Sequence, residues 1–278
     1  YPPPIYCRKE LVHNNLVVNA LAERGLVFIE EVTEAPERGT VVFSAHGVAP
    51  EVRRMAEARR QTIIDATCPF VTKVHNEVKR FAAKGFTVFV AGYREHDEIV
   101  GLCGEAPAHV LVLESPEEAR CAHPEEPDKV ALVTQTTLSE ADTQAITSEL
   151  VKKFPALQRP SRSDICYATH NRQNAARRLA NVADLVLVLG SPTSSNTNRL
   201  VEVIEAENCP VQLVSCLDDL RGMDRSVPKI VGITAGASTP EHFVQDVVGA
   251  FGKNGTITVE ELCVVEESQV LTLPKGLE

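Results

Sequence analysis

Residues 185–196, with the sequence LVLVLGSPTSSN, decide the fold class of this chain. The five apolar residues at 185–189 predict a strand that is buried on both faces, as strands of parallel sheets are. The polar loop that follows leads into an amphipathic stretch at 195–206, which predicts a helix. A strand, a polar loop and a helix in this order form the βα unit of α/β proteins.

The same unit recurs along the chain. Strands are predicted at 4–7, 41–44, 62–65, 87–91, 130–134, 185–189 and 229–234, and in the tail at 256–259 and 269–273. Helices are predicted at 50–60, 71–83, 140–154, 171–182, 195–206 and 240–252. Because strands and helices alternate, we expect an α/β protein with mostly parallel sheets.

Length and composition argue against several classes of protein. The 278 residues are 44% hydrophobic and 24% charged, which is typical of a globular chain with two or three lobes. Lys and Arg number 28 and Asp and Glu 38, so the net charge is 28 − 38 = −10. This balance argues against nucleic acid as the main partner. The apolar runs are also too short to span a membrane.

The start of the chain and the spacing of its cysteines indicate a compartment. Residues from Tyr1 onward lack the charged and apolar regions of a signal peptide. The eight cysteines are widely spaced, unlike those of a small disulfide-rich secreted protein. We therefore expect reduced thiols in the cytoplasm, some of them ligands of a metal centre.

Four of the predicted strands end in loops of small hydrogen-bonding residues. These loops are SAHG at 44–47, TQTT at 134–137, GSPTSSN at 190–196 and TAGAS at 234–238. One such loop is most simply explained as the cap of the next helix. Four loops at the carboxyl ends of parallel strands, where α/β proteins bind ligands, instead predict one shared polar site.

An internal repeat points to two of the cysteines. Cys68 precedes a predicted helix, a strand and Gly92, with a spacing of 92 − 68 = 24. Cys166 precedes the same elements and Gly190, with a spacing of 190 − 166 = 24. Each copy would offer one thiolate to a shared centre, although a buried cysteine is more often a small apolar residue.

The repeat also predicts a third member. His96 and Ser194 each lie 28 residues after their cysteine, in a loop that follows a strand. If His13 is their equivalent, its cysteine lies at 13 − 28 = −15, upstream of Tyr1. Three thiolates without CxxC pairs fit a structural zinc site poorly. They fit an iron–sulfur cubane in which one iron lacks a protein ligand and is open to a substrate oxygen.

Six ordered motifs closely resemble the 4-hydroxy-3-methylbut-2-enyl diphosphate reductase (LytB) family, from about residue 3 to the C-terminus. The motifs are SAHGV at 44–48, DATCPFVTKVH at 65–75, TQTTLS at 134–139, DICYAT at 164–169, SSN at 194–196 and TAGAS at 234–238. The resemblance implies three pseudo-symmetric α/β lobes in a trefoil around a central site. On this basis we expect lobes at 1–67, 68–165 and 166–254, followed by a tail at 255–278.

The resemblance also implies the roles of individual residues. Cys68 and Cys166 correspond to two of the three ligands of a 4Fe-4S cluster. Glu98 corresponds to the carboxylate that relays protons, and Thr136 to the threonine near the substrate hydroxyl; with His96 they form the expected catalytic group. The expected substrate-binding residues are His13, His46, His96, Ser194, Ser195, Asn196 and Ser238.

The activity that the resemblance implies is the last step of the methylerythritol phosphate route to isoprenoids. The allylic diphosphate loses its hydroxyl group by reduction and gives isopentenyl or dimethylallyl diphosphate. The electrons come from a ferredoxin or a flavodoxin. Protonation by a carboxyl group in a low-dielectric pocket suits this chemistry, because the hydroxyl is a poor leaving group.

The chain departs from the family at one important point. The family's first cluster cysteine lies in a CxGV-type motif near the N-terminus, and that motif is absent here, with the strand and helix that accompany it. One alternative is therefore a diphosphate-binding relative without a cluster or redox activity. Another is a zinc hydrolase that uses His46, His96 and Glu98, although the HExxH spacing is absent.

Overall fold

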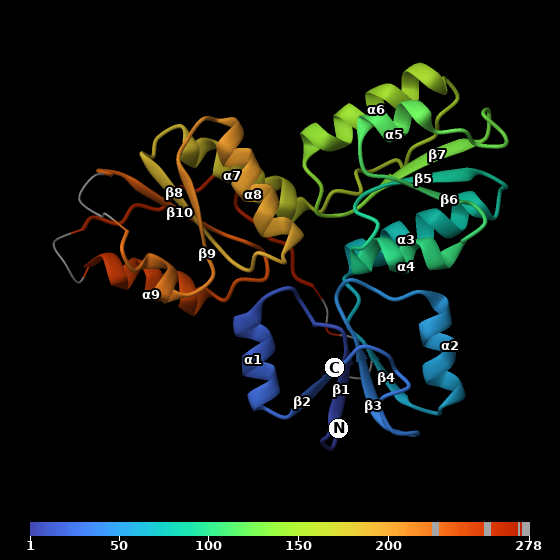
Figure 1. Ribbon diagram of the computed structural model, residues 1–278, viewed down its shortest axis with the longest axis horizontal. Helices are drawn as coiled ribbons and strands as arrows, with labels where there is room; N and C mark the ends of the chain where they lie inside the picture. Colours follow the sequence, from blue (N-terminus) through green and yellow to red (C-terminus); the bar gives the residue numbers. More distant parts are fainter. Residues whose placement is uncertain (224–227, 253–256, 272, 274–278) are drawn as a thin grey trace. The chain divides into compact units, whose positions relative to one another are not determined.

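The computed structural model describes residues 1–223, 228–252, 257–271 and 273. The chain forms two compact units (Figure 1). One unit contains Tyr1–Val12, Leu21–Cys166 and the described residues from Val270 onward. The other contains His13–Ala20 and Tyr167–Gln269.

The first unit begins with a four-stranded parallel sheet in the order β2-β1-β3-β4. Its strands are β1 (Ile5–Arg8), β2 (Leu26–Ile29), β3 (Thr40–Phe43) and β4 (Thr62–Asp65). Helix α1 (Asn15–Glu23) lies between β1 and β2 in the chain, and α2 (Pro50–Ala58) between β3 and β4. The core forms where Val52 and Ala56 of α2 pack with Val41 and Phe43 of β3.

A second parallel sheet in this unit has the order β6-β5-β7. Its elements are β5 (Thr87–Ala91), β6 (Val110–Leu113), β7 (Val130–Thr134), α3 (Pro69–Ala82), α4 (Asp97–Glu105), α5 (Pro116–Cys121) and α6 (Glu140–Lys153). Because side chains alternate along a strand, Val88 and Val90 pack with α3 and α4. Phe89 and Ala91 pack on the other face with α5 and α6 (Figure 1).

The second unit repeats this arrangement with a parallel sheet in the order β10-β8-β9. Its elements are β8 (Leu185–Leu189), β9 (Val211–Val214), β10 (Val231–Ala235), α7 (Tyr167–Ala180), α8 (Ser195–Ala206), the 3-10 helix η1 (Leu217–Leu220) and α9 (Glu241–Gly252). Val186 and Val188 pack with α7 and α8. Leu187 and Leu189 pack with Phe243 of α9 on the opposite face.

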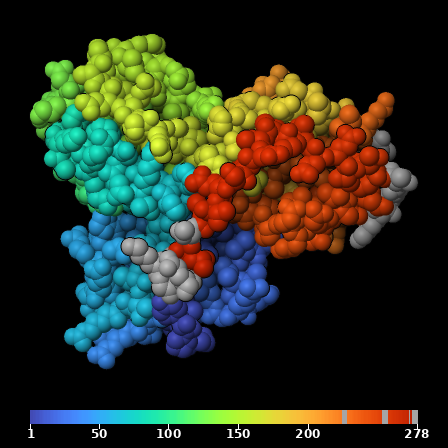
Figure 2. Space-filling model, turned by 180° about the vertical axis from the view of Figure 1, so that it is seen from behind, coloured from blue at the N-terminus to red at the C-terminus, as the bar shows by residue number. Residues whose placement is uncertain are grey.

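The structure confirms the α/β class and the parallel sheets, and it corrects the tail. The strands predicted at 256–259 and 269–273 do not form within the described residues 257–259, 269–271 and 273. Val259 is 66% exposed and Val270 89% exposed, so no sheet covers the apolar residues that suggested strands. Residues 257–269 instead run over the surface of their unit (Figure 2, red). Among the described residues, no helix is both long and apolar enough to cross a membrane.

The buried central strand β8 should carry a large share of the stability of the second unit. We expect Leu187→Ala to lower the free energy of unfolding by about 2–5 kcal/mol, because the side chain is fully buried and its loss leaves a cavity. Urea denaturation followed by circular dichroism measures the change. The matched control is Val182→Ala, since Val182 is 57% exposed and its truncation should cost about 0.5 kcal/mol or less. Equal effects of the two substitutions would contradict this assignment of the core.

Candidate functional site

The first unit holds a buried carboxylate that is bonded to a single partner residue. Glu98 lies in the first turn of α4 and is 1% exposed. The backbone N–H of Thr136 donates to its Oε1 at 2.8 Å, and the Thr136 hydroxyl donates to its Oε2 at 2.9 Å. Thr136 follows β7, so the contact ties the end of this strand to the start of α4.

The local sequence explains how Glu98 reaches this place. His96 is the N-cap of α4, and its Nδ1 accepts the backbone N–H of Glu98 at 3.1 Å. Upstream, a Cβ atom at Gly92 would lie 2.5 Å from Ile99 Cδ1, so only glycine allows the strand end to approach α4 this closely. Gln135 accepts the backbone N–H of Tyr93 at 3.0 Å and thereby ties the same loop to the end of β7.

The environment changes the acidity of Glu98. Burial raises the pKa of this carboxyl from its ordinary 4.5 to about 7, and the nearby charge of Asp164 raises the pKa further. The two hydrogen bonds from Thr136 oppose this effect because they stabilise the charged form. A group with a pKa near 7 exists in both protonation states at neutral pH, which is what a general acid requires.

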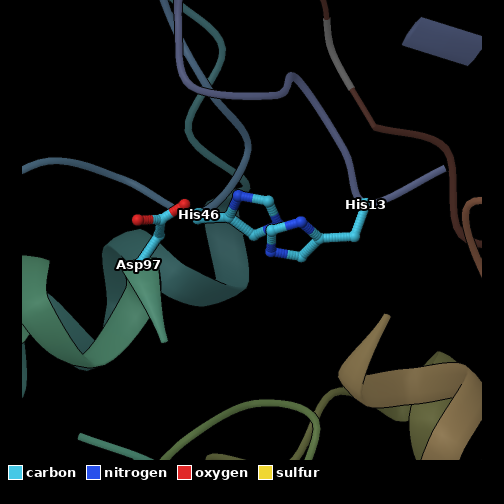
Figure 3. A group of neighbouring side chains, drawn as sticks. All are labelled: His13, His46 and Asp97. Atoms are coloured by element: carbon cyan, nitrogen blue, oxygen red, sulfur yellow. The ribbon is translucent and has the colours of Figure 1, made fainter. Parts of the chain in front are cut away.

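The loop after β3 brings His46 to the same helix terminus. The His46 and His96 rings lie 5.5 Å apart between centroids in an edge-to-face arrangement. A ring nitrogen of His46 and a carboxylate oxygen of Asp97 lie within 4.8 Å of each other (Figure 3). Gly47 has a φ of +81°, and a Cβ atom there would lie 2.8 Å from His75 Nε2. The tight turn that presents His46 therefore requires glycine.

Cys68 and Cys166 occupy equivalent positions in the first unit. The Cys68 N–H donates to Ala45 O, and the Cys166 N–H donates to Thr136 O, each at 3.0 Å. Ala45 and Thr136 both lie two residues past the end of their strand, β3 or β7. The internal repeat of the sequence is thus also a repeat of structure around the two cysteines.

The state of the thiols fits a soft-metal centre. No disulfide links any of the eight cysteines, all of which lie among the described residues, and Cys68 and Cys166 are half-buried. Cys68 is the N-cap of α3. Burial raises the pKa of the Cys7 thiol to about 12, which keeps this residue protonated. Cys68 and Cys166 therefore suit iron–sulfur ligation, whereas Cys7 does not.

The polar residues of the second unit gather at the ends of β8 and β10. Ser194 is the N-cap of α8, where its Oγ accepts the Thr197 N–H at 3.3 Å. Asn196 Oδ1 accepts the Ala237 N–H at 2.9 Å. Ser238 Oγ donates to His13 O at 3.2 Å. With Ser195 as its first residue, the N-terminus of α8 offers N–H donors that suit an anion.

The structure thus places all the predicted site residues, in two groups. His46, Cys68, His96, Glu98, Thr136 and Cys166 belong to the first unit, and His13, Ser194, Ser195, Asn196 and Ser238 to the second. Asp97 and Gln135 were missed, although Asp97 lies between His96 and Glu98 and Gln135 lies in the loop at 134–137. The zinc alternative loses support, because His46, His96 and Glu98 do not form a group with metal-ligand spacing among the described residues.

Comparisons with known proteins agree on one family. Residues 1–251 match the family described as LytB protein. The 4-hydroxy-3-methylbut-2-enyl diphosphate reductase of Acidothermus cellulolyticus is 45% identical over 100% of this chain and 82% of its own length. The enzyme of the same name from Ralstonia nicotianae is 42% identical over 99% of this chain and 85% of its own length.

Solved structures give the same result. The E-1-hydroxy-2-methyl-but-2-enyl-4-diphosphate reductase of Plasmodium falciparum superposes with a TM-score of 0.95 at 33% identity, over 99% of this chain and 87% of that one. A second structure, of (E)-4-hydroxy-3-methyl-but-2-enyl diphosphate reductase, has a TM-score of 0.61 at 28% identity, over 90% and 88% of the two chains.

Thr136 should set the acidity of Glu98. We expect Thr136→Val to raise the pKa of Glu98 above about 7, because the hydroxyl donor that stabilises the carboxylate is lost. Carbon-13 NMR of glutamate-labelled protein, with the Glu98 signal assigned from Glu98→Gln, measures the pKa. Thr147→Val is the matched control, since this buried hydroxyl donates to Thr143 O inside α6. A lowered pKa in Thr136→Val would refute the assignment.

Burial of Glu98 should also make stability depend on pH. Below pH 4.5 the carboxyl is protonated in the folded and the unfolded chain, and its burial then carries no charge penalty. As the pH rises through about 7 the folded form must hold a charge, and stability falls by on the order of 3 kcal/mol.

We therefore expect Glu98→Gln to gain stability relative to the wild type between pH 4.5 and pH 8. Urea denaturation at both pH values measures this gain. Glu95→Gln, at an exposed position of the same loop, serves as the control and should show no such trend. A Glu98→Gln difference that is constant with pH would argue against a raised pKa.

Proposed function

This chain belongs to the LytB family, and we propose that it reduces 4-hydroxy-3-methylbut-2-enyl diphosphate to isopentenyl and dimethylallyl diphosphate. This reaction is the last step of the methylerythritol phosphate route to isoprenoids. The main support for this proposal is the buried Glu98 carboxyl. Its pKa is raised to about 7, and Thr136 donates a hydrogen bond to each of its oxygens.

The reaction needs a proton donor close to the hydroxyl group that leaves. The C–O bond breaks when the oxygen takes up a proton and departs as water, while two electrons and a second proton complete the hydrocarbon. Glu98 can supply a proton at neutral pH, because much of it is protonated there. Thr136 places a hydroxyl beside the carboxylate, and His96 holds the first turn of α4 that carries it.

Cys68 and Cys166 would hold a 4Fe-4S cluster as two of its three cysteine ligands. When bound, such a cluster supplies the two electrons one at a time. Two half-buried thiols on equivalent strand-end loops fit this role. A ferredoxin or a flavodoxin would deliver the electrons.

The diphosphate needs local donors, because the net charge of −10 repels anions. Ser194, Ser195, Asn196 and Ser238 supply hydroxyl and amide groups, and the N-terminus of α8 adds backbone N–H groups. The histidines proposed to bind the substrate are His13, His46 and His96. Neutral donors of this kind fit a diphosphate without requiring a basic surface.

The full-length gene product, purified anaerobically, tests this function. We expect a brown protein that contains iron and sulfide and reduces the substrate with a strong one-electron reductant. Glu98→Gln should lower kcat by about 100-fold or more while substrate binding persists, because only the proton donor is lost. Glu95→Gln, the exposed control, should keep full activity.

Two outcomes would contradict the proposal. Full activity in Glu98→Gln would remove this residue from the mechanism. A colourless, iron-free protein that binds the diphosphate in calorimetry would instead identify a diphosphate-binding relative without a cluster.

A further inference from the structure

One lysine of α3 binds the segment that leads to Cys166. Lys73 Nζ donates to Arg162 O and Ser163 O at 2.9 Å each, and to Asp164 Oδ1 at 2.7 Å. An ammonium group has three N–H donors, so these three acceptors use its full capacity. Two of them are backbone carbonyls, so Lys73 binds the backbone of residues 162 and 163 as well as the side chain of Asp164.

The bound segment is in turn attached to β7. Asp164 is almost fully buried, and its Oδ2 accepts the Thr134 N–H at 3.1 Å. Two residues later the Cys166 N–H donates to Thr136 O at 3.0 Å. The segment 164–166 is therefore attached to the end of β7 at two points, and Lys73 adds a further attachment at residues 162–164.

Lys73 belongs to the helix that begins at the other cysteine. Cys68 is the N-cap of α3, and its carbonyl accepts the Thr72 N–H at 2.9 Å, so the first turn of this helix is well formed. Lys73 follows in the second turn. A continuous path thus runs from Cys68 along α3 to Lys73, and through Asp164 to Cys166, although Lys73 and Asp164 are 91 positions apart in the chain.

We propose that Lys73 is a positioning residue that fixes the separation of Cys68 and Cys166 before any metal is present. The two thiols then form a dithiol half-site that is already assembled in the reduced, metal-free protein. This inference rests on the proposed function only where it takes these two cysteines as the cluster ligands. Outer residues that orient metal ligands typically change metal affinity by about 10- to 100-fold when they are replaced.

The charge of Asp164 has to be controlled in any test. Lys73→Met alone leaves a buried carboxylate without its cation, which can destabilise the fold for reasons unrelated to positioning. Lys73→Met with Asp164→Asn removes that charge together with the ion pair. The double variant therefore separates positioning from stability, and thermal denaturation checks that it remains folded.

A trivalent arsenical that bridges two neighbouring thiols, phenylarsine oxide, is the probe. We titrate it into the reduced, metal-free full-length protein, with Cys68→Ser and Cys166→Ser to define binding that does not involve the pair. The double variant should bind the arsenical at least about 10-fold more weakly than the wild type. Lys84→Met, at an exposed position just after α3, is the matched control and should bind as the wild type does.

Each outcome decides the inference. Equal affinity in the wild type and the double variant would overturn it, and so would unchanged binding in Cys68→Ser. Should the double variant fail to fold, Lys73→Gln takes its place, because its amide has two N–H donors, one of which can bond to the buried Asp164 carboxylate; a smaller loss of affinity is expected, and no loss overturns the inference.

A second measurement separates this inference from the proposed function. In the iron-loaded protein, the double variant should lose iron to a chelator faster than the wild type does. Weakened arsenical binding in a protein that never takes up iron would sustain the positioning role of Lys73 and refute the proposed function. If the protein contains iron and is active but the double variant binds the arsenical as the wild type does, the proposed function stands and the positioning role of Lys73 is refuted.

Discussion

The structure depends on the three hydrogen bonds of Thr136. Its N–H and hydroxyl both donate to the Glu98 carboxylate, and its carbonyl accepts the N–H of Cys166. One residue just after β7 thereby contacts both the proposed proton donor and a proposed cluster ligand. Because β7 lies in a parallel sheet with helices packed on both faces, this residue has little freedom to move.

The same contacts balance opposing electrostatic effects. Burial disfavours the charged form of Glu98, and the two donors of Thr136 favour it, which leaves the pKa at about 7. The charge of Asp164 raises the pKa of Glu98, and burial raises the pKa of Asp164 itself, an effect that its contact with Lys73 opposes. The acidity of Glu98 is therefore linked to the segment that precedes Cys166, which brings proton supply and thiol placement into one network.

The central strands and the edge strands β4, β7 and β10 were predicted from the sequence, whereas three other edge strands were not. The strand at 185–189 and the helix at 195–206 agree with β8 and α8 because their apolar periods are long and regular. The edge strands β2, β6 and β9 were missed, and two of them expose a large apolar side chain, Val27 or Leu111. Helix α4 was missed because Gly101 and Gly104 weaken its helical pattern.

For the candidate site, the residues were predicted from the sequence, but their contacts were not. Motif types and strand-end positions pointed to Glu98 and Thr136, but not to the number of bonds between them. The contact of Lys73 with residues 162–164 joins positions about 90 apart, and no local pattern records such a pairing. Residue chemistry was thus readable from the chain, whereas the contacts that tune it arise only when strands and helices pack.

The backbone contact made by Cys68 is repeated at Cys166, whereas the contact with the Glu98 carboxyl is made at the second of these strand ends. Cys68 and Cys166 donate to equivalent carbonyls, those of Ala45 and Thr136. Ala45 has no side-chain donor, whereas Thr136 carries the hydroxyl that binds Glu98. The repeated backbone therefore gives the two cysteines matching attachments, and at Thr136 the same residue also donates its hydroxyl to a buried carboxyl. Under the proposed function, the repeated scaffold would hold two cluster ligands in the same way and would link the proton donor to one of them through Thr136.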